Sequence, residues 1–175
     1  KVNVAEILRR ELARRSWKGE QVVIGAATDP YQPAEGRYRL TRRCLEVLAE
    51  FRNPVGVITK NQLVTRDLDV LAELARDGCA DVALSITTLD ESLRRRLEPR
   101  TSRADLRLDA IAKLNAAGIP TGVMVAPVIP GLNDHEIPAI LQRSADAGAR
   151  FAGYVLLRLP HAVKTLFEAR LERHY

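Results

Sequence analysis

Residues 54–86, PVGVITKNQLVTRDLDVLAELARDGCADVALSI, contain one complete strand–helix–strand unit. The runs 54–59 and 80–86 are almost continuously apolar, β-branched or small, which indicates parallel strands that are buried on both faces. Apolar side chains between the two runs share one helical face, and Gly78 follows the last turn; they are Leu68, Val70, Leu71, Leu74 and Ala75. The stretch predicts a βαβ unit and therefore an α/β fold with a parallel sheet.

The same pattern recurs along the rest of the chain. Further buried strands are predicted over residues 21–26, 121–126 and 151–157, with helical patterns and short loops between them. Such repeats leave two architectures open, a doubly wound sheet and a closed or partial (β/α) barrel. The chain opens on an amphipathic helical pattern over residues 4–15 with no strand before it. We therefore expect five βα units plus an N-terminal helix, with the first of six strands missing from this chain.

The composition predicts one globular domain over residues 1–175, because 46% of the residues are hydrophobic and 28% are charged. Two cysteines cannot form a disulfide framework, so we expect a reducing, cytoplasmic location. The longest uncharged stretch, residues 114–133, contains prolines and glycines that exclude a membrane helix. The net charge of +5 comes from 22 arginines against five lysines, which permits an anionic partner without showing one.

Polar residues follow the predicted strands at their carboxyl ends, where βα proteins place their functional groups. Thr28 and Asp29 enter a loop stiffened by Pro30 and Pro33. This loop would hold backbone carbonyls and a carboxylate toward a cationic or hydroxyl-bearing ligand. An Asp-Pro turn with no ligand is the simpler interpretation.

Three further strand exits carry candidate binding residues. Lys60 would place an ammonium beside a bound carboxylate, although a solvated loop lysine and a Schiff-base lysine are alternatives. Ser85 lies in a buried strand pattern, where its hydroxyl needs a partner. Ala126 and Pro127 form a small, uncharged exit that would make a flat wall for a planar ring, or simply a rigid corner.

Other patterns predict no catalytic residue and no metal site. The basic tract of Arg94, Arg95, Arg96, Arg100, Arg103 and Arg107 is more typical of a solvated helix face than of a nucleic-acid groove. Cys44 and Cys79 lie too far apart to chelate a metal as a pair, and we expect both in the core. No phosphate-binding loop or nucleophile elbow occurs.

The strand-exit motifs, taken in order, resemble radical S-adenosylmethionine (radical SAM) proteins. The motifs are TDPYQP at residues 28–33, TKN at 59–61, SITT at 85–88, LEPR at 97–100 and VAPVIPGLND at 125–134. Within that superfamily the pattern is most similar to the spore photoproduct lyase-like subgroup. The resemblance covers nearly the whole chain.

The resemblance implies a partial (β/α)6 TIM-like barrel whose carboxyl rim binds S-adenosylmethionine and a [4Fe-4S] cluster. One-electron cleavage of the sulfonium would give a 5′-deoxyadenosyl radical for hydrogen abstraction, with flavodoxin or ferredoxin as the reductant. By similarity, Thr28 and Asp29 would meet the methionyl amino group or ribose. Lys60 and Ser85 would hold the methionyl carboxylate or ribose. Ala126 and Pro127 would line the adenine. Lyase chemistry on a nucleic acid, as in DNA repair, is compatible with the resemblance.

One departure limits this interpretation. The family holds its cluster with a CxxxCxxC loop after the first strand, and this chain has no such loop. We therefore expect the cluster ligands to lie before Lys1, and this chain to be an inactive, metal-free fragment of a radical SAM enzyme. Two rival functions stay open: a Schiff-base lyase that uses Lys60, and a non-catalytic nucleic-acid-binding α/β domain.

Overall fold

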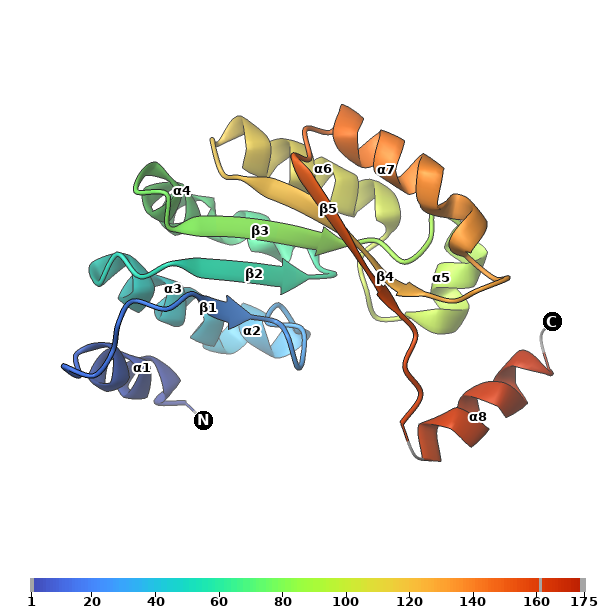
Figure 1. Ribbon diagram of the computed structural model, residues 1–175, viewed down its shortest axis with the longest axis horizontal. Helices are drawn as coiled ribbons and strands as arrows, with labels where there is room; N and C mark the ends of the chain where they lie inside the picture. The colour runs from blue at the N-terminus through green and yellow to red at the C-terminus, as the bar shows by residue number, and fades with distance from the viewer. Residues whose placement is uncertain (1, 161, 174–175) are drawn as a thin grey trace.

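Five parallel strands form one curved sheet in the computed structural model, which describes residues 2–160 and 162–173 (Figure 1). The strands are β1 (Val22–Ile24), β2 (Val55–Thr59), β3 (Ala80–Ser85), β4 (Thr121–Val128) and β5 (Phe151–Leu156). Their spatial order is the same as their order in the chain. All neighbouring pairs are parallel, and β1 and β5 form the two edges.

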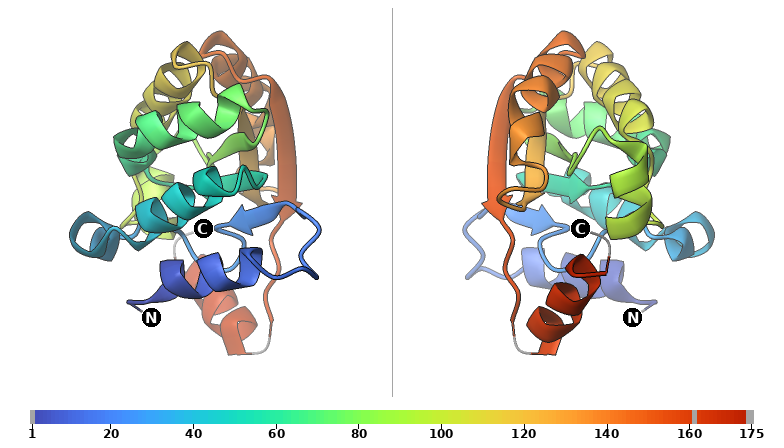
Figure 2. Two further views of the ribbon diagram at one scale, coloured as in Figure 1. Left: turned by 90° about the vertical axis from the view of Figure 1, so that its left-hand side faces the viewer. Right: turned by 90° about the vertical axis from the view of Figure 1, so that its right-hand side faces the viewer.

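The helices that connect the strands lie on one face of the sheet, whereas α8 follows the last strand and lies away from that layer (Figures 1 and 2). The helices of the described residues are α1 (Val4–Leu12), α2 (Pro33–Tyr38), α3 (Leu40–Glu50), η1 (Gln62–Asp67, a 3-10 helix), α4 (Leu68–Arg76), α5 (Glu91–Leu97), α6 (Ala104–Ala116), η2 (Asp134–Glu136, also 3-10), α7 (Ile137–Asp146) and α8 (Ala162–Leu171). Parallel crossovers are right-handed, so adding every strand at the same edge keeps every helix on the same face. A doubly wound sheet would instead reverse its strand order and carry helices on both faces. The predicted partial barrel is therefore confirmed.

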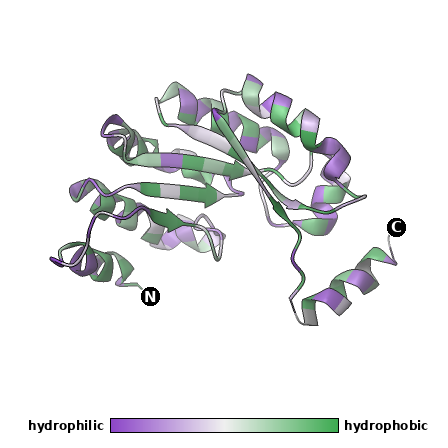
Figure 3. Cartoon of the chain, in the orientation of Figure 1, coloured by the Kyte–Doolittle hydropathy of each residue, from purple (hydrophilic) through white to green (hydrophobic). Residues whose placement is uncertain are grey.

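The hydrophobic core lies between the sheet and the helices that follow it. Alternate residues of the strands point into this layer, among them Val55, Val57, Val82, Leu84 and Val123, and all of these are buried. The apolar faces of α3, α4 and α6 meet them from the other side, and the central strands are largely hydrophobic in Figure 3. This layer fixes the strands, and with them the loops at their carboxyl ends.

The helix ends follow the sequence pattern closely. Gly78, Gly118 and Gly148 come one residue after the C-caps of α4, α6 and α7 and have positive φ angles, as predicted for glycines at this position. The first helix is shorter than expected and ends at Leu12. The short helix α2 begins at Pro33, where the predicted loop ends, and the sequence analysis contained no prediction of it.

The prediction that β5 is buried is wrong. Five of its six residues are exposed, and Tyr154 keeps 70% of its surface. The physical reason is that α7 packs against β4, while the chain after β5 runs away from the sheet toward α8 (Figure 1).

Among the described residues, no helix is both long enough and apolar enough to cross a membrane.

Candidate functional site

The sequence-predicted residues at β2, β3 and β4 stand side by side at the carboxyl rim. Thr59 pairs with Leu84 in the sheet register, so Lys60 follows at the level of Ser85. Ser85 in turn pairs with Met124, two residues before Ala126. Leu84 and Ile86, the residues before and after Ser85 in the chain, belong to the helix-facing core. Ser85 therefore faces the opposite, inner side of the sheet.

Asp29 links the exit of β1 to the exit of β2. One carboxylate oxygen accepts from the Tyr31 amide at 2.8 Å and from the Thr59 hydroxyl at 2.7 Å. The other accepts from the Lys60 amide at 2.7 Å. The Tyr31 contact is the Asp-Pro turn that the sequence suggested, but the two contacts to β2 go beyond a local turn. Asp29 therefore positions the neighbouring strand exit as well as its own loop.

The Lys60 ammonium lies inside a cluster of three acceptors. Its Nζ atom donates to the Thr87 hydroxyl at 2.9 Å, to the Ala126 carbonyl at 2.7 Å and to the Glu98 carboxylate. The side chain is 26% exposed, so the solvated loop lysine is wrong for this position. Lys60 instead connects β2 to the exits of β3 and β4.

Glu98 and Arg107 complete this cluster, and the sequence did not single out either of them as a site residue. Glu98 accepts from Lys60 and Thr87 with one oxygen and from Arg107 at 3.3 Å with the other. Arg107, only 2% exposed, also donates to the Ser85 and Ser102 carbonyls and to the Thr101 hydroxyl. The loop after α5 is therefore held against the rim by buried charge.

The electrostatics of the cluster follow from its burial. Burial lowers the pKa of Lys60 below its usual value, although the Glu98 carboxylate opposes this shift. Burial likewise lowers the pKa of Arg107, again against Glu98. For Glu98, burial acts to raise the pKa, but Lys60 and Arg107 outweigh it and hold the pKa below its usual range. The carboxylate therefore stays ionised between two cations.

Two polar side chains from the segment after β4 hold the remaining loops. The fully buried Asn133 amide donates to the Thr87 carbonyl at 2.7 Å and to the Pro127 carbonyl at 3.0 Å, and its oxygen accepts from the Ile129 amide at 2.7 Å. Glu136 accepts from the Leu89 amide at 2.7 Å and from the Thr88 hydroxyl. These contacts fix the β3 exit against the β4 exit and set the backbone around Ala126 and Pro127.

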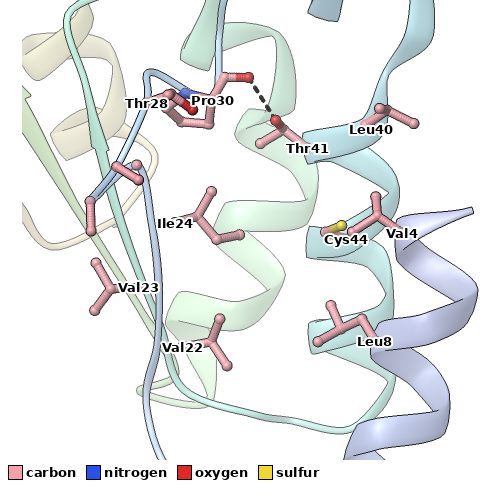
Figure 4. Close-up of a pocket in the computed structure, with 13 residues that line it drawn as sticks. Val4, Leu8, Val22, Val23, Ile24, Thr28, Pro30, Leu40, Thr41 and Cys44 are labelled. Carbon is pink, nitrogen blue, oxygen red and sulfur yellow. Dashed lines mark hydrogen bonds between the residues drawn. The ribbon is translucent and has the colours of Figure 1, made fainter. Parts of the chain in front are cut away.

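Thr28 lies apart from the Lys60 cluster. It is exposed and lines an apolar cavity of about 480 Å³ between α1, β1 and α3 (Figure 4). Other lining residues include Val4, Leu8, Ile24 and Cys44. Thr28 therefore belongs to the free edge of the sheet, whereas Asp29, Lys60, Ser85 and Ala126 are brought together.

The basic tract is not a continuous solvated face. Arg94 and Arg107 are both buried, and Arg94 donates to the Glu98 and Thr101 carbonyls. Arg95 pairs with Glu91, and Arg103 pairs with Asp105, on the surface. The tract thus serves largely to shape the loop that presents Glu98.

The described residues do not fit an iron–sulfur cluster. No group of three or more His, Cys, Asp or Glu side chains within residues 2–160 and 162–173 is arranged to hold a metal ion. Cys44 is buried in α3, as expected. Cys79 precedes β3 at the end of the sheet opposite the rim and is partly exposed rather than in the core.

The charged groups at the rim are of the kinds that pair with a zwitterionic α-amino acid, although the Lys60 ammonium is bound by Thr87, Ala126 and Glu98 in this structure. Asp29 supplies a carboxylate and Lys60 an ammonium on adjacent strand exits, and both side chains are only partly buried. A carboxylate pairs with an ammonium group and an ammonium with a carboxylate, the two charged groups of an amino acid. The small, uncharged Ala126 and Pro127 on β4 offer an apolar neighbour for the rest of such a ligand.

Comparison with known proteins gives a consistent result. The family model of the Radical SAM superfamily matches residues 1–143. An uncharacterized protein of Mycobacterium tuberculosis is 43% identical over 151 residues, which covers 85% of this chain and 44% of that protein. A radical SAM Nalpha-GlyT isomerase of Pseudomonas phage M6 is 26% identical over 173 residues, covering 98% of this chain and 35% of the phage protein. The chain thus spans less than half the length of these relatives.

A solved structure shares the fold. A spore photoproduct lyase variant with bound AdoMet and dinucleoside spore photoproduct superposes with a TM-score of 0.74 and 20% sequence identity. The match covers 98% of this chain and 51% of the lyase chain.

Proposed function

Because the chain belongs to the radical SAM superfamily, we propose that its carboxyl rim binds S-adenosylmethionine for radical chemistry. The observation that carries the proposal is that Asp29 and Lys60 lie at neighbouring strand exits, where the Lys60 backbone amide donates to the Asp29 carboxylate at 2.7 Å. A carboxylate and an ammonium in this position complement the amino and carboxylate groups of a methionyl moiety. When bound and reduced by one electron, the cofactor supplies a 5′-deoxyadenosyl radical that abstracts hydrogen from a substrate.

In this proposal, residues at the exits of β1, β2, β3 and β4 contact different parts of the cofactor. Asp29, with the loop that contains Thr28, meets the methionyl ammonium or the ribose. Lys60 and Ser85 hold the carboxylate or the ribose. Ala126 and Pro127 line the adenine. The exposed position of Thr28 gives it the weakest support of the six residues, since it lies on the cavity beside β1.

The [4Fe-4S] ligands lie outside these 175 residues in our proposal, because the described side chains do not fit a cluster. The free edge of β1 and the apolar cavity beside it support a further strand at this edge, followed by the cluster loop. Without that segment the chain is inactive and free of metal. The reductant is a flavodoxin or a ferredoxin, and a reducing cytoplasm suits the two free cysteines.

A nucleic acid is the substrate class that we propose, in lyase-like chemistry related to DNA repair. The fold shared with a spore photoproduct lyase supports this choice. The basic tract supports it less than its composition suggested, since Arg94 and Arg107 are buried. Their burial also counts against a non-catalytic domain that binds nucleic acid through this tract alone.

The decisive experiment uses a longer protein that includes the upstream segment. After anaerobic reconstitution with iron, sulfide and a reductant, it should form 5′-deoxyadenosine from S-adenosylmethionine. No 5′-deoxyadenosine from a cluster-loaded protein would overturn the proposal. The 175-residue chain, treated identically, should contain no cluster by iron analysis and visible spectroscopy. A stoichiometric [4Fe-4S] centre on this chain would contradict our proposal that the cluster ligands lie outside it.

A Schiff-base lyase is the alternative function, and the lowered pKa of the Lys60 amine favours it. An imine at Lys60 would be trapped by borohydride in the presence of a carbonyl compound. We expect no trapped adduct, because Thr87, Ala126 and Glu98 already bind the Lys60 side-chain nitrogen. A covalent adduct mapped to Lys60 by mass spectrometry would favour the lyase over the radical enzyme.

A further inference from the structure

The Lys60 cluster is saturated within the protein. An ammonium has three N–H donors, and Thr87, Ala126 and Glu98 accept all three. A ligand carboxylate can therefore reach Lys60 only if one of these contacts is released.

Of these three acceptors, Glu98 is the one whose side chain can move away from Lys60. The Ala126 carbonyl is part of β4, and the Thr87 hydroxyl is held between Glu98 and the Ala126 carbonyl at 2.8 Å from each. Glu98 instead follows the last residue of α5, in the loop before α6. It also has a second cation in reach, because its other oxygen lies 3.3 Å from Arg107.

Arg107 is fixed where it can receive the released carboxylate. Its guanidinium donates to the Ser85 and Ser102 carbonyls, so it does not depend on Glu98 for its position. The exposed fractions support this division, with 26% for the Lys60 side chain and 2% for Arg107. A ligand therefore reaches Lys60 and not Arg107.

We infer that Glu98 is an internal competitor for Lys60, which a carboxylate-bearing ligand displaces while Arg107 retains the displaced side chain. The inference rests on the proposed function, since it takes the methionyl carboxylate as that ligand. It assigns Glu98 as a positioning residue that sets the affinity and selectivity of the rim for carboxylates.

The test compares affinities in the full-length, cluster-loaded protein by isothermal titration calorimetry under anaerobic conditions. Glu98→Gln keeps the shape of the side chain and removes its charge. It should bind S-adenosylmethionine on the order of tenfold more tightly than wild type, because the charged competitor is gone. Glu98→Asp withdraws the carboxylate from Lys60, and should give a smaller gain. Glu73→Gln, an exposed acid on α4, is the matched control and should leave the affinity unchanged.

A second ligand distinguishes competition for Lys60 from a general effect of the Glu98 substitution on ligand binding. 5′-Methylthioadenosine shares the adenosine and lacks the amino acid, so Glu98→Gln should change its affinity less than about twofold if the competition is for the carboxylate. Weaker or unchanged binding of S-adenosylmethionine by Glu98→Gln, or equal tightening for both ligands, overturns the inference and leaves the proposed function standing. If Glu98→Gln does not fold, as judged by its melting transition, the same outcomes are decided on Glu98→Asp. Absence of binding by the wild type would instead overturn the proposed function itself.

Discussion

The backbone amide of Lys60 donates to the Asp29 carboxylate at 2.7 Å, so the exits of the first two strands are held together. Replacing Asp29 by Ala leaves this amide and the Thr59 hydroxyl without their acceptor. We expect the free energy of unfolding to fall by about 1–3 kcal/mol, as measured by urea denaturation. Asp109→Ala, at an exposed site on α6, should change it by less than about 0.5 kcal/mol. Equal effects of the two substitutions would remove Asp29 from its bridging role.

Lys60→Ala removes the ammonium from the rim. Binding of S-adenosylmethionine to the cluster-loaded protein should weaken by on the order of tenfold or more, because a charge-assisted contact to the carboxylate is lost. Calorimetric titration measures this change, and Lys113→Ala on the outer surface of α6 provides the control. If Lys60→Ala binds as tightly as the control, Lys60 does not contact the cofactor.

The pH dependence of stability should carry a contribution from Glu98. Burial acts to raise the pKa of Glu98, but the two cations Lys60 and Arg107 lower it by more than burial raises it. The pKa in the folded state therefore lies below the unfolded value of about 4.3. A depressed pKa contributes stability above the unfolded pKa, and this contribution is lost as the pH falls through the folded pKa. Urea denaturation from pH 7 down to pH 3 should therefore show a steeper acid loss for the wild type than for Glu98→Gln. Parallel curves would contradict this prediction.

Arg107→Lys tests whether geometry as well as charge matters at the back of the cluster. A lysine retains the charge but cannot reproduce the fork that reaches two backbone carbonyls and Glu98. We expect a loss of about 2–4 kcal/mol in the free energy of unfolding, since buried acceptors would lose their donor. Arg103→Lys, four residues earlier and exposed, should be nearly neutral. A neutral Arg107→Lys would mean that the loop after α5 is held by other contacts.

Gly25 sets the distance between β1 and β2 at the rim. Its φ angle is +106°, and a Cβ atom there would lie 2.0 Å from the Ile58 carbonyl oxygen. Gly25→Ala should therefore lower the free energy of unfolding by about 2 kcal/mol or more, through backbone strain and the clash together. Gly36→Ala in α2 meets no atom within 4 Å, and should be neutral or slightly stabilising. Comparable melting temperatures for the two variants would show that β1 can shift at little cost.

The sequence predicted what depends on local periodicity and on strand exits. Continuous apolar runs, apolar helix faces and helix-ending glycines place all five strands and the main helices, and Asp29, Lys60, Ser85 and Ala126 do gather at the rim. The choice of a partial barrel over a doubly wound sheet came from the family resemblance and not from spacing, and the strand order in the structure agrees with it. The cofactor roles of these residues stay predictions.

The elements that the sequence missed depend on contacts between distant segments. The exposure of β5 depends on where α7 and α8 pack, and no local pattern contains that information. Glu98 and Arg107 looked like surface charges in a basic tract, because their burial requires the loop after α5 to fold back on the rim. The signal available in the sequence was the LEPR motif beside the strand exits, which the resemblance included without a role for its acid.

The buried Asn133 amide has a consequence for the thermodynamics of binding. With three hydrogen bonds it holds the backbone after β3 and β4 in one arrangement. The conformational entropy of these loops is therefore lost when the protein folds, and not when a ligand arrives. The wall around Ala126 and Pro127 is preorganised, so the binding energy of an adenine placed there is available for affinity instead of for ordering the loop that receives it.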